Sequence, residues 1–196
     1  VSSVPEIVFN EDGTDLDFRV EGSSVTNVIF VNAGDNDLHI GTGADLITDT
    51  AGTSNTRIGV NAGNSIQSGG NYNVVVGDEA GTAITTGDNN TLLGYQTGDA
   101  LTTPFGNVAI GDRALQAETT GQRNTAVGST ALYAQNNTGD ELTYNTAVGY
   151  QAGSAITTGV RNTLLGSLTG DALTDADYNI AIGYQALDNA STSADW

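Results

Sequence analysis

One five-residue phrase recurs along this chain at nearly constant intervals, and its recurrence restricts the possible folds more than any other feature. Each copy begins with Asn and ends with Gly four residues later. The intervals between successive glycines are 18, 17, 17, 17, 21, 17 and 17 residues. The copies are Asn55 with Gly59, Asn73 with Gly77, Asn90 with Gly94, Asn107 with Gly111, Asn124 with Gly128, Asn145 with Gly149, Asn162 with Gly166, and Asn179 with Gly183. Repeats of this length predict a solenoid in which each copy is one coil.

A ninth, degraded copy and a longer period complete the pattern. The ninth copy ends at Gly41 and has Asp37 in place of the Asn. The segment that begins at Ala80 returns, with few changes, 72 residues later at Ala152. That interval holds three coils of 17 residues and one of 21, so we infer that four coils were duplicated as a unit.

The three residues between the Asn and the Gly predict a short strand. The residue before each Gly is Ile, Val or Leu, and we expect this column to form a core ladder. The middle column points the other way in an extended strand and is also apolar, apart from Arg57. It therefore predicts packing against another copy of the chain. These trimer-interface candidates are Val75, Leu92, Ala109, Ala126, Ala147, Leu164 and Ala181.

The remainder of each coil predicts a second strand and two corners. Segments such as AITTG and ALTTP follow each glycine and begin with a small residue such as Ala83 or Ala100. Asn fits one corner because it tolerates a left-handed backbone and its amide can bond the next coil. Gly fits the opposite corner, where a Cβ would clash. Both columns have a structural interpretation.

The fold that we predict is all-β. Residues 37–196 form a parallel β-solenoid or β-roll of about nine coils of 17–18 residues, one of them of 21, packed as a homotrimer. Residues 1–36 read as alternating strands, EIVF, LDFRVE and NVIFVN, separated by turn sequences. We expect this segment to be a β-hairpin adaptor or cap that covers the open edge of the array.

Two resemblances to known protein families add to this prediction. The phrase in NVAIGDRAL (107–115), NTAVGSTAL (124–132) and NIAIGYQAL (179–187) resembles the head repeats of trimeric autotransporter adhesins. That resemblance implies a trimer of parallel β-rolls. Residues 8–43 look like modules of tailed-phage tail fibres. The second resemblance implies a trimeric fibre shaft on a virion, with a receptor-binding tip outside this chain.

Composition excludes some function classes. Five Lys and Arg against 23 Asp and Glu give a net charge of −18, which is opposite to what nucleic acid or an anionic membrane requires. No window of the sequence is apolar enough for a membrane span. We therefore expect no nucleic-acid or membrane partner.

Residues that could carry chemistry are few. His39 is the sole histidine, so a Ser-His-Asp triad is not expected, although three copies of His39 could meet on a trimer axis. Carboxylates cluster in turn sequences, where solvated acids are the simpler interpretation. These clusters are Asp78 with Glu79, Asp140 with Glu141, and Asp171 with Asp175 and Asp177. We predict no catalytic residue and no cofactor or metal, and calcium binding by these turns stays open.

Aromatic and Thr positions offer two further alternatives. Tyr95, Tyr150 and Tyr184 share one column but belong to coils that are not neighbours, which favours packing or isolated surface positions over a sugar platform. The pairs Thr85–Thr86 and Thr157–Thr158, with Thr102–Thr103 and Thr119–Thr120 between them, form a partial array that keeps ice binding as a minor alternative.

The function that we expect is structural. The chain is predicted to be the trimeric shaft of a phage tail fibre, which holds a host-receptor-binding tip away from the virion and contacts other virion or fibre proteins. The alternatives are a bacterial surface adhesin head, with an extracellular location, a polysaccharide-degrading tailspike or an ice-binding solenoid.

Overall fold

The structure is a computed structural model that describes residues 30–32, 37–39, 52–139 and 142–188. The chain divides into two units, Val1–Leu46 and Ile47–Trp196. Each unit is described separately below.

The described part of the first unit is a pair of short strands. β1 (Phe30–Asn32) pairs with β2 (Asp37–His39) in antiparallel register, with Phe30 opposite His39. β1 lies within the predicted strand NVIFVN, and the other two predicted strands lie outside the described residues. The residues interpreted as the start of a ninth coil therefore pair with β1 and not with the solenoid sheet.

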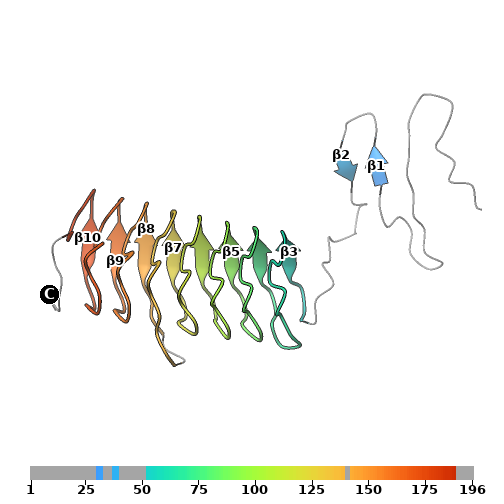
Figure 1. Cartoon of the computed structure of the whole chain (residues 1–196), viewed down its shortest axis with the longest axis horizontal. Helices are drawn as coiled ribbons and strands as arrows, with labels where there is room; N and C mark the ends of the chain where they lie inside the picture. Colours follow the sequence, from blue (N-terminus) through green and yellow to red (C-terminus); the bar gives the residue numbers. More distant parts are fainter. Residues whose placement is uncertain (1–29, 33–36, 40–51, 140–141, 189–196) are drawn as a thin grey trace, which may run out of the picture. The chain divides into compact units, whose positions relative to one another are not determined.

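The second unit contains one eight-stranded parallel sheet (Figure 1), in which the strands follow one another in chain order. The strands are β3 (Thr56–Ile58), β4 (Val74–Val76), β5 (Thr91–Leu93), β6 (Val108–Ile110), β7 (Thr125–Val127), β8 (Thr146–Val148), β9 (Thr163–Leu165) and β10 (Ile180–Ile182). The pairing register aligns equivalent positions of the repeat, for example Ala109 beside Ala126. The prediction of an all-β parallel solenoid is confirmed, with about seven turns between β3 and β10.

Each described coil contains one strand and not the predicted two. The segments after the Gly form turns, and only isolated bridges such as Asp88 with Phe105 occur there. Neighbouring coils still hydrogen-bond across these turns, as the Thr85 amide does to the Thr102 carbonyl at 2.8 Å. Left-handed residues at several positions of every coil, such as Glu79 and Gly81, bend the chain too often for a second extended stretch.

The interior of the solenoid is lined by the middle column of the sheet, which corrects the prediction. The seven side chains proposed as trimer-interface candidates are at most 4% exposed, and they lie inside their own coils. These residues are Val75, Leu92, Ala109, Ala126, Ala147, Leu164 and Ala181. Conversely, the column predicted to be a core ladder lies outside, where Ile58 is 49% exposed and Ile182 67%. The two faces of the strand were assigned the wrong way round.

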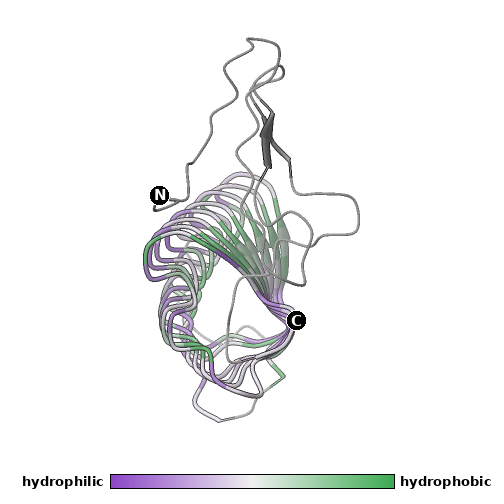
Figure 2. Ribbon diagram, turned by 90° about the vertical axis from the view of Figure 1, so that its right-hand side faces the viewer, coloured by the Kyte–Doolittle hydropathy of each residue, from purple (hydrophilic) through white to green (hydrophobic). Residues whose placement is uncertain are grey.

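The Asn column explains this inversion. Side chains two residues apart on a strand share a face, and every Asn side chain is buried. The middle residue, two positions after the Asn, must therefore point inward as well. Ile84, Leu101, Ile156 and Leu173 complete the core from the opposite wall. Viewed along the stack, the coils superimpose, and the strands form one wall of the ring (Figure 2).

Two polar residues interrupt the row of Ile and Leu on the opposite wall. Glu118 and Gln135 are fully buried, and the Gln135 amide donates to the Glu118 carboxylate at 2.8 Å. The same carboxylate accepts the backbone amide of Gly121 at 2.7 Å. Gln135 in turn accepts a bond from Asn145 at 2.8 Å. This network gives partners to the buried carboxylate of Glu118 and to the buried amide of Gln135, at the junction between a 17-residue coil and the 21-residue coil.

Candidate binding surface

Buried asparagines form a continuous ladder along one corner of the solenoid. The side-chain oxygen of each Asn accepts the backbone N–H of the Asn in the next coil, as Asn145 does from Asn162 at 2.8 Å. The amide group of the Asn also joins the beginning of its coil to the end of the same coil, since Asn162 Nδ2 donates to the Ala176 carbonyl at 2.8 Å. Asn124 Nδ2 is the exception and has no partner among the described residues, because the longer coil displaces that carbonyl. The left-handed residue is the one before the Asn, not the Asn itself as predicted.

Substitution of Asn162 by Ala is expected to lower the free energy of unfolding by about 2 to 4 kcal/mol, because it leaves the buried Asn179 amide and Ala176 carbonyl without partners. Urea unfolding followed by circular dichroism measures this change. The matched control is Asn64→Ala, since Asn64 is exposed and only accepts a long bond from Ser65. The control should change stability by less than about 0.5 kcal/mol, and an equal loss in both variants would contradict the role of the ladder.

The Gly column lies at the other end of each strand and brings successive backbones close together. All eight glycines have φ between +124° and +143°. A Cβ on Gly111 would lie 2.6 Å from the carbonyl oxygen of Gly128 in the next coil. Only glycine satisfies both conditions.

The outward side of the sheet is an uncharged face, which we call the outer face. It consists of the two strand columns that flank the buried middle column, and each member is Thr, Val, Ile or Leu. The first column is Thr56, Val74, Thr91, Val108, Thr125, Thr146, Thr163 and Ile180, and the second is Ile58, Val76, Leu93, Ile110, Val127, Val148, Leu165 and Ile182. A continuous aliphatic stripe over eight strands is unusual for a chain of net charge −18.

Tyr95, Tyr150 and Tyr184 border the outer face at the Gly corner. Their side chains are exposed, and they belong to coils that are not neighbours. They do not form a ladder of their own.

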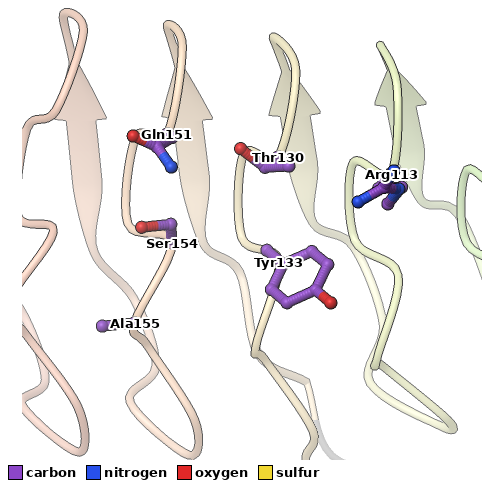
Figure 3. Close-up of a pocket in the computed structure, with 6 residues that line it drawn as sticks. All are labelled: Arg113, Thr130, Tyr133, Gln151, Ser154 and Ala155. Carbon is purple, nitrogen blue, oxygen red and sulfur yellow. The ribbon is translucent and has the colours of Figure 1, made fainter.

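A small groove lies on another side of the solenoid and crosses three coils. Its volume is about 220 Å³, below the range usual for sites that enclose a small molecule. The lining side chains are those of Arg113, Thr130, Tyr133, Gln151, Ser154 and Ala155 (Figure 3). Arg113 is the single charged member, and its Nε lies 3.9 Å from the Asp112 carboxylate. None of the candidate carboxylates lines this groove.

Two of the candidate carboxylates, Glu79 and Asp177, accept hydrogen bonds that hold local structure. Glu79 accepts a bond from Gln96 at 2.7 Å, and Asp177 accepts the Val160 amide at 2.7 Å. Asp140 and Glu141 lie outside the described residues. Within the described ranges, no three His, Cys, Asp or Glu side chains gather in a way that could hold a metal ion.

Among the carboxylates that the structure describes, Asp99 has a perturbed proton affinity. Burial raises the pKa of Asp99 above its ordinary value, although the bond donated by Gln116 at 3.3 Å opposes the shift. Glu79 adds repulsion in the same direction.

The Thr pairs contribute to coil stacking. The hydroxyl of Thr85 donates to the Thr102 carbonyl at 3.0 Å, and that of Thr102 donates to the Thr119 carbonyl at 3.1 Å. Thr157 repeats this contact to Thr174 at 3.0 Å. One hydroxyl of each pair is therefore directed along the stack toward protein.

Sequence reasoning missed a row of aromatic and Arg side chains at the corner before the Asn ladder. It comprises Phe105, Arg123, Tyr144, Arg161 and Tyr178, one from each of five consecutive coils. The signal was available, because four of these five residues occupy the position directly before the Asn. We name this row the aromatic–arginine ladder.

The described residues contain no helix of the length and apolarity that a membrane crossing needs.

The comparisons with known proteins identify no family for this chain. No family model matches the chain, and no curated protein or solved structure matches it either.

Proposed function

We propose that the chain is a structural fibre protein, the homotrimeric shaft of a phage tail fibre. In this proposal the outer faces of three copies close on one another, and the shaft holds a receptor-binding tip, located outside this chain, away from the virion. We assign it no catalytic role and no cofactor. Its partners are two further copies and other fibre or virion proteins.

The outer face is the observation that carries this proposal. Parallel sheets are usually covered on both faces, yet here the core covers only the inner one. The outer face has no charge and presents aliphatic side chains such as Leu93 and Leu165, which are 45% and 47% exposed. A second and third copy offer the same uncharged stripe at the same spacing, whereas the charged side chains of the described coils lie outside these two columns, and Arg57 lies in the middle column of β3. The resemblance of the repeat phrase to trimeric adhesin heads supports the number three.

The expected mechanism is mechanical. Backbone hydrogen bonds, the Asn ladder and the Thr hydroxyls all run from coil to coil along the axis. Load along the axis is therefore distributed over many equivalent contacts between neighbouring coils, as in other solenoids. A rigid spacer needs this arrangement more than it needs a pocket.

A second candidate rests on a specific feature of the outer face. Five of the eight residues in its first column are Thr, and they recur at the regular spacing of the strands. A flat, regular Thr array is the kind of surface that could match an ice lattice. This candidate requires the outer face to stay open to water, so the oligomeric state separates it from the fibre.

Light scattering on the intact chain at neutral pH tests the proposal. We expect a mass of three chains of 20.0 kDa, stable on dilution because an aliphatic interface over eight strands is hydrophobic. A monomer would reject the trimeric shaft, and inhibition of ice growth by that monomer would then favour the second candidate. A trimer that loses glycan cleavage when an acid pair is removed would instead indicate a tailspike enzyme.

A further inference from the structure

Contacts inside the aromatic–arginine ladder fix two groups of side chains, Phe105–Arg123–Tyr144 and Arg161–Tyr178. The guanidinium carbon of Arg123 lies 5.7 Å from the ring centre of Phe105 and 5.6 Å from that of Tyr144. That of Arg161 lies 5.3 Å from the ring centre of Tyr178. Each Arg also donates to the neighbouring phenol oxygen, at 2.8 Å from Arg123 to Tyr144 and at 3.0 Å from Arg161 to Tyr178. The rings and cations are thus positioned before any ligand arrives.

The ladder is not part of the core. Phe105 and Tyr144 are both 39% exposed, Tyr178 is 57% exposed, and both Arg side chains are exposed. Packing inside the chain therefore does not explain why these residue types stand together on five successive coils.

The backbone at these positions also does not require them. Arg123, Tyr144, Arg161 and Tyr178 have φ between 52° and 60°, a left-handed conformation that bulky residues rarely adopt. Of the four earlier coils, two carry Asn89 or Gly106 at this position, which are the types that tolerate it best, and the other two carry Ser54 and Tyr72. The turn alone would favour Asn or Gly, so the side chains of the ladder need another explanation.

The charge of the two arginines points to an anionic ligand. The single ion pair among the described residues joins Arg113 to Asp112, and no described carboxylate pairs with Arg123 or Arg161. Both guanidinium groups retain free N–H donors, which suit a carboxylate, while the ring of Tyr144 between them and the rings of Phe105 and Tyr178 on either side suit the apolar faces of sugars. One linear ligand that offers both groups in alternation is a polysaccharide of uronic acids.

The spacing of the ladder fits such a chain. Successive coils lie about 4.8 Å apart, so Arg123 and Arg161, two coils apart, are separated by about 10 Å along the axis. An extended β-1,4-linked pyranose chain advances by nearly one coil per sugar and turns alternate sugars to the same side. Every second carboxylate could therefore meet an Arg, and the rings would contact the sugars between.

We propose that the aromatic–arginine ladder binds a linear carboxylated polysaccharide lying parallel to the solenoid axis. This site would let the shaft itself hold an acidic surface glycan, in addition to any tip. The inference does not depend on the trimer, because all five residues belong to one chain.

Isothermal titration of the intact chain with two matched hexamers tests the proposal. β-1,4-linked hexamannuronate carries the carboxylates, and β-1,4-mannohexaose has the same backbone without them. We expect the uronate to bind about tenfold more tightly or better, because only the uronate offers carboxylates to the two guanidinium groups. Equal binding of the two hexamers, or no binding of hexamannuronate, would overturn the proposal without any variant.

Substitution identifies the residues. Arg123→Gln with Arg161→Gln should weaken uronate binding by about tenfold or more, whereas the matched control Arg113→Gln lies outside the ladder and should bind as the parent does. Unchanged affinity in the double variant would reject the assignment.

Light scattering on the same samples separates the two proposals. A mass that falls only in the double variant would make the ladder a seam between copies, whereas a monomeric parent that still binds hexamannuronate would reject the trimer alone.

Discussion

Replacement of Gly111 by Ala should destabilise the solenoid by about 4 kcal/mol, which is a large part of the stability of a typical domain. Two effects combine at this position. The φ of +132° is strained for any residue with a Cβ, and the new methyl group would lie 2.6 Å from the carbonyl oxygen and carbon of Gly128. Because backbone cannot yield as a side chain can, the two coils must separate. Urea unfolding of the purified variant measures the loss.

Gly183→Ala is the matched control for this prediction. Gly183 has a similar φ of +124°, but a Cβ there would meet nothing within 4 Å. It should therefore show only the strain, about 1 to 3 kcal/mol. A loss in Gly111→Ala no larger than that in Gly183→Ala would mean that close stacking at the Gly corner is not what restricts the column to glycine.

The solenoid could be predicted because its signal is repeated. Eight copies of one phrase fix the coil length and the position of each strand, and the paired columns, such as Ala109 beside Ala126, follow from the alignment of the copies. Every strand of the described solenoid sheet lies at a position that the phrase predicts. The ninth coil is not confirmed: this copy has Asp37 in place of the Asn, and its described residues, Asp37–His39, pair with β1 in antiparallel register.

The direction of the side chains was predicted wrongly for a physical reason. Hydrophobicity alone predicts that the Ile, Val and Leu column before the Gly lies inside and that the Ala-rich middle column contacts another chain. The strand, however, has only three residues and is preceded by a buried Asn. The hydrogen bonds of that Asn outweigh the larger aliphatic surface of Ile58 or Ile182, which stays outside. A polar residue thus sets the register of an apolar strand.

The aromatic–arginine ladder could have been found only partly from the sequence. Arg123, Tyr144, Arg161 and Tyr178 share one column, but the order of contacts depends on coils of unequal length being stacked in register. Phe105 stands one position earlier than the others, and only the fold shows that Arg123 lies over its ring.

Two charged residues on the outer face should dissociate the proposed trimer. Ile110→Asp with Val148→Asp places one carboxylate on β6 and one on β8, in the second column of the outer face. Burial of each aliphatic side chain contributes about 1.5 to 3 kcal/mol, and an unpaired carboxylate in its place is strongly disfavoured. Since each change occurs in three copies, the mass measured by light scattering should fall from three chains to one.

The control must add the same charge elsewhere. Thr103→Asp with Tyr133→Asp makes two substitutions at exposed positions outside the outer face, and this variant should keep the mass of the parent chain. Urea unfolding of both double variants then separates dissociation from misfolding, because a variant that only dissociates still unfolds in one cooperative transition. If both variants retain three chains, the copies associate through another surface. If both become monomers, added net charge and not the outer face governs assembly, because repulsion among chains already at −18 would be sufficient to part them.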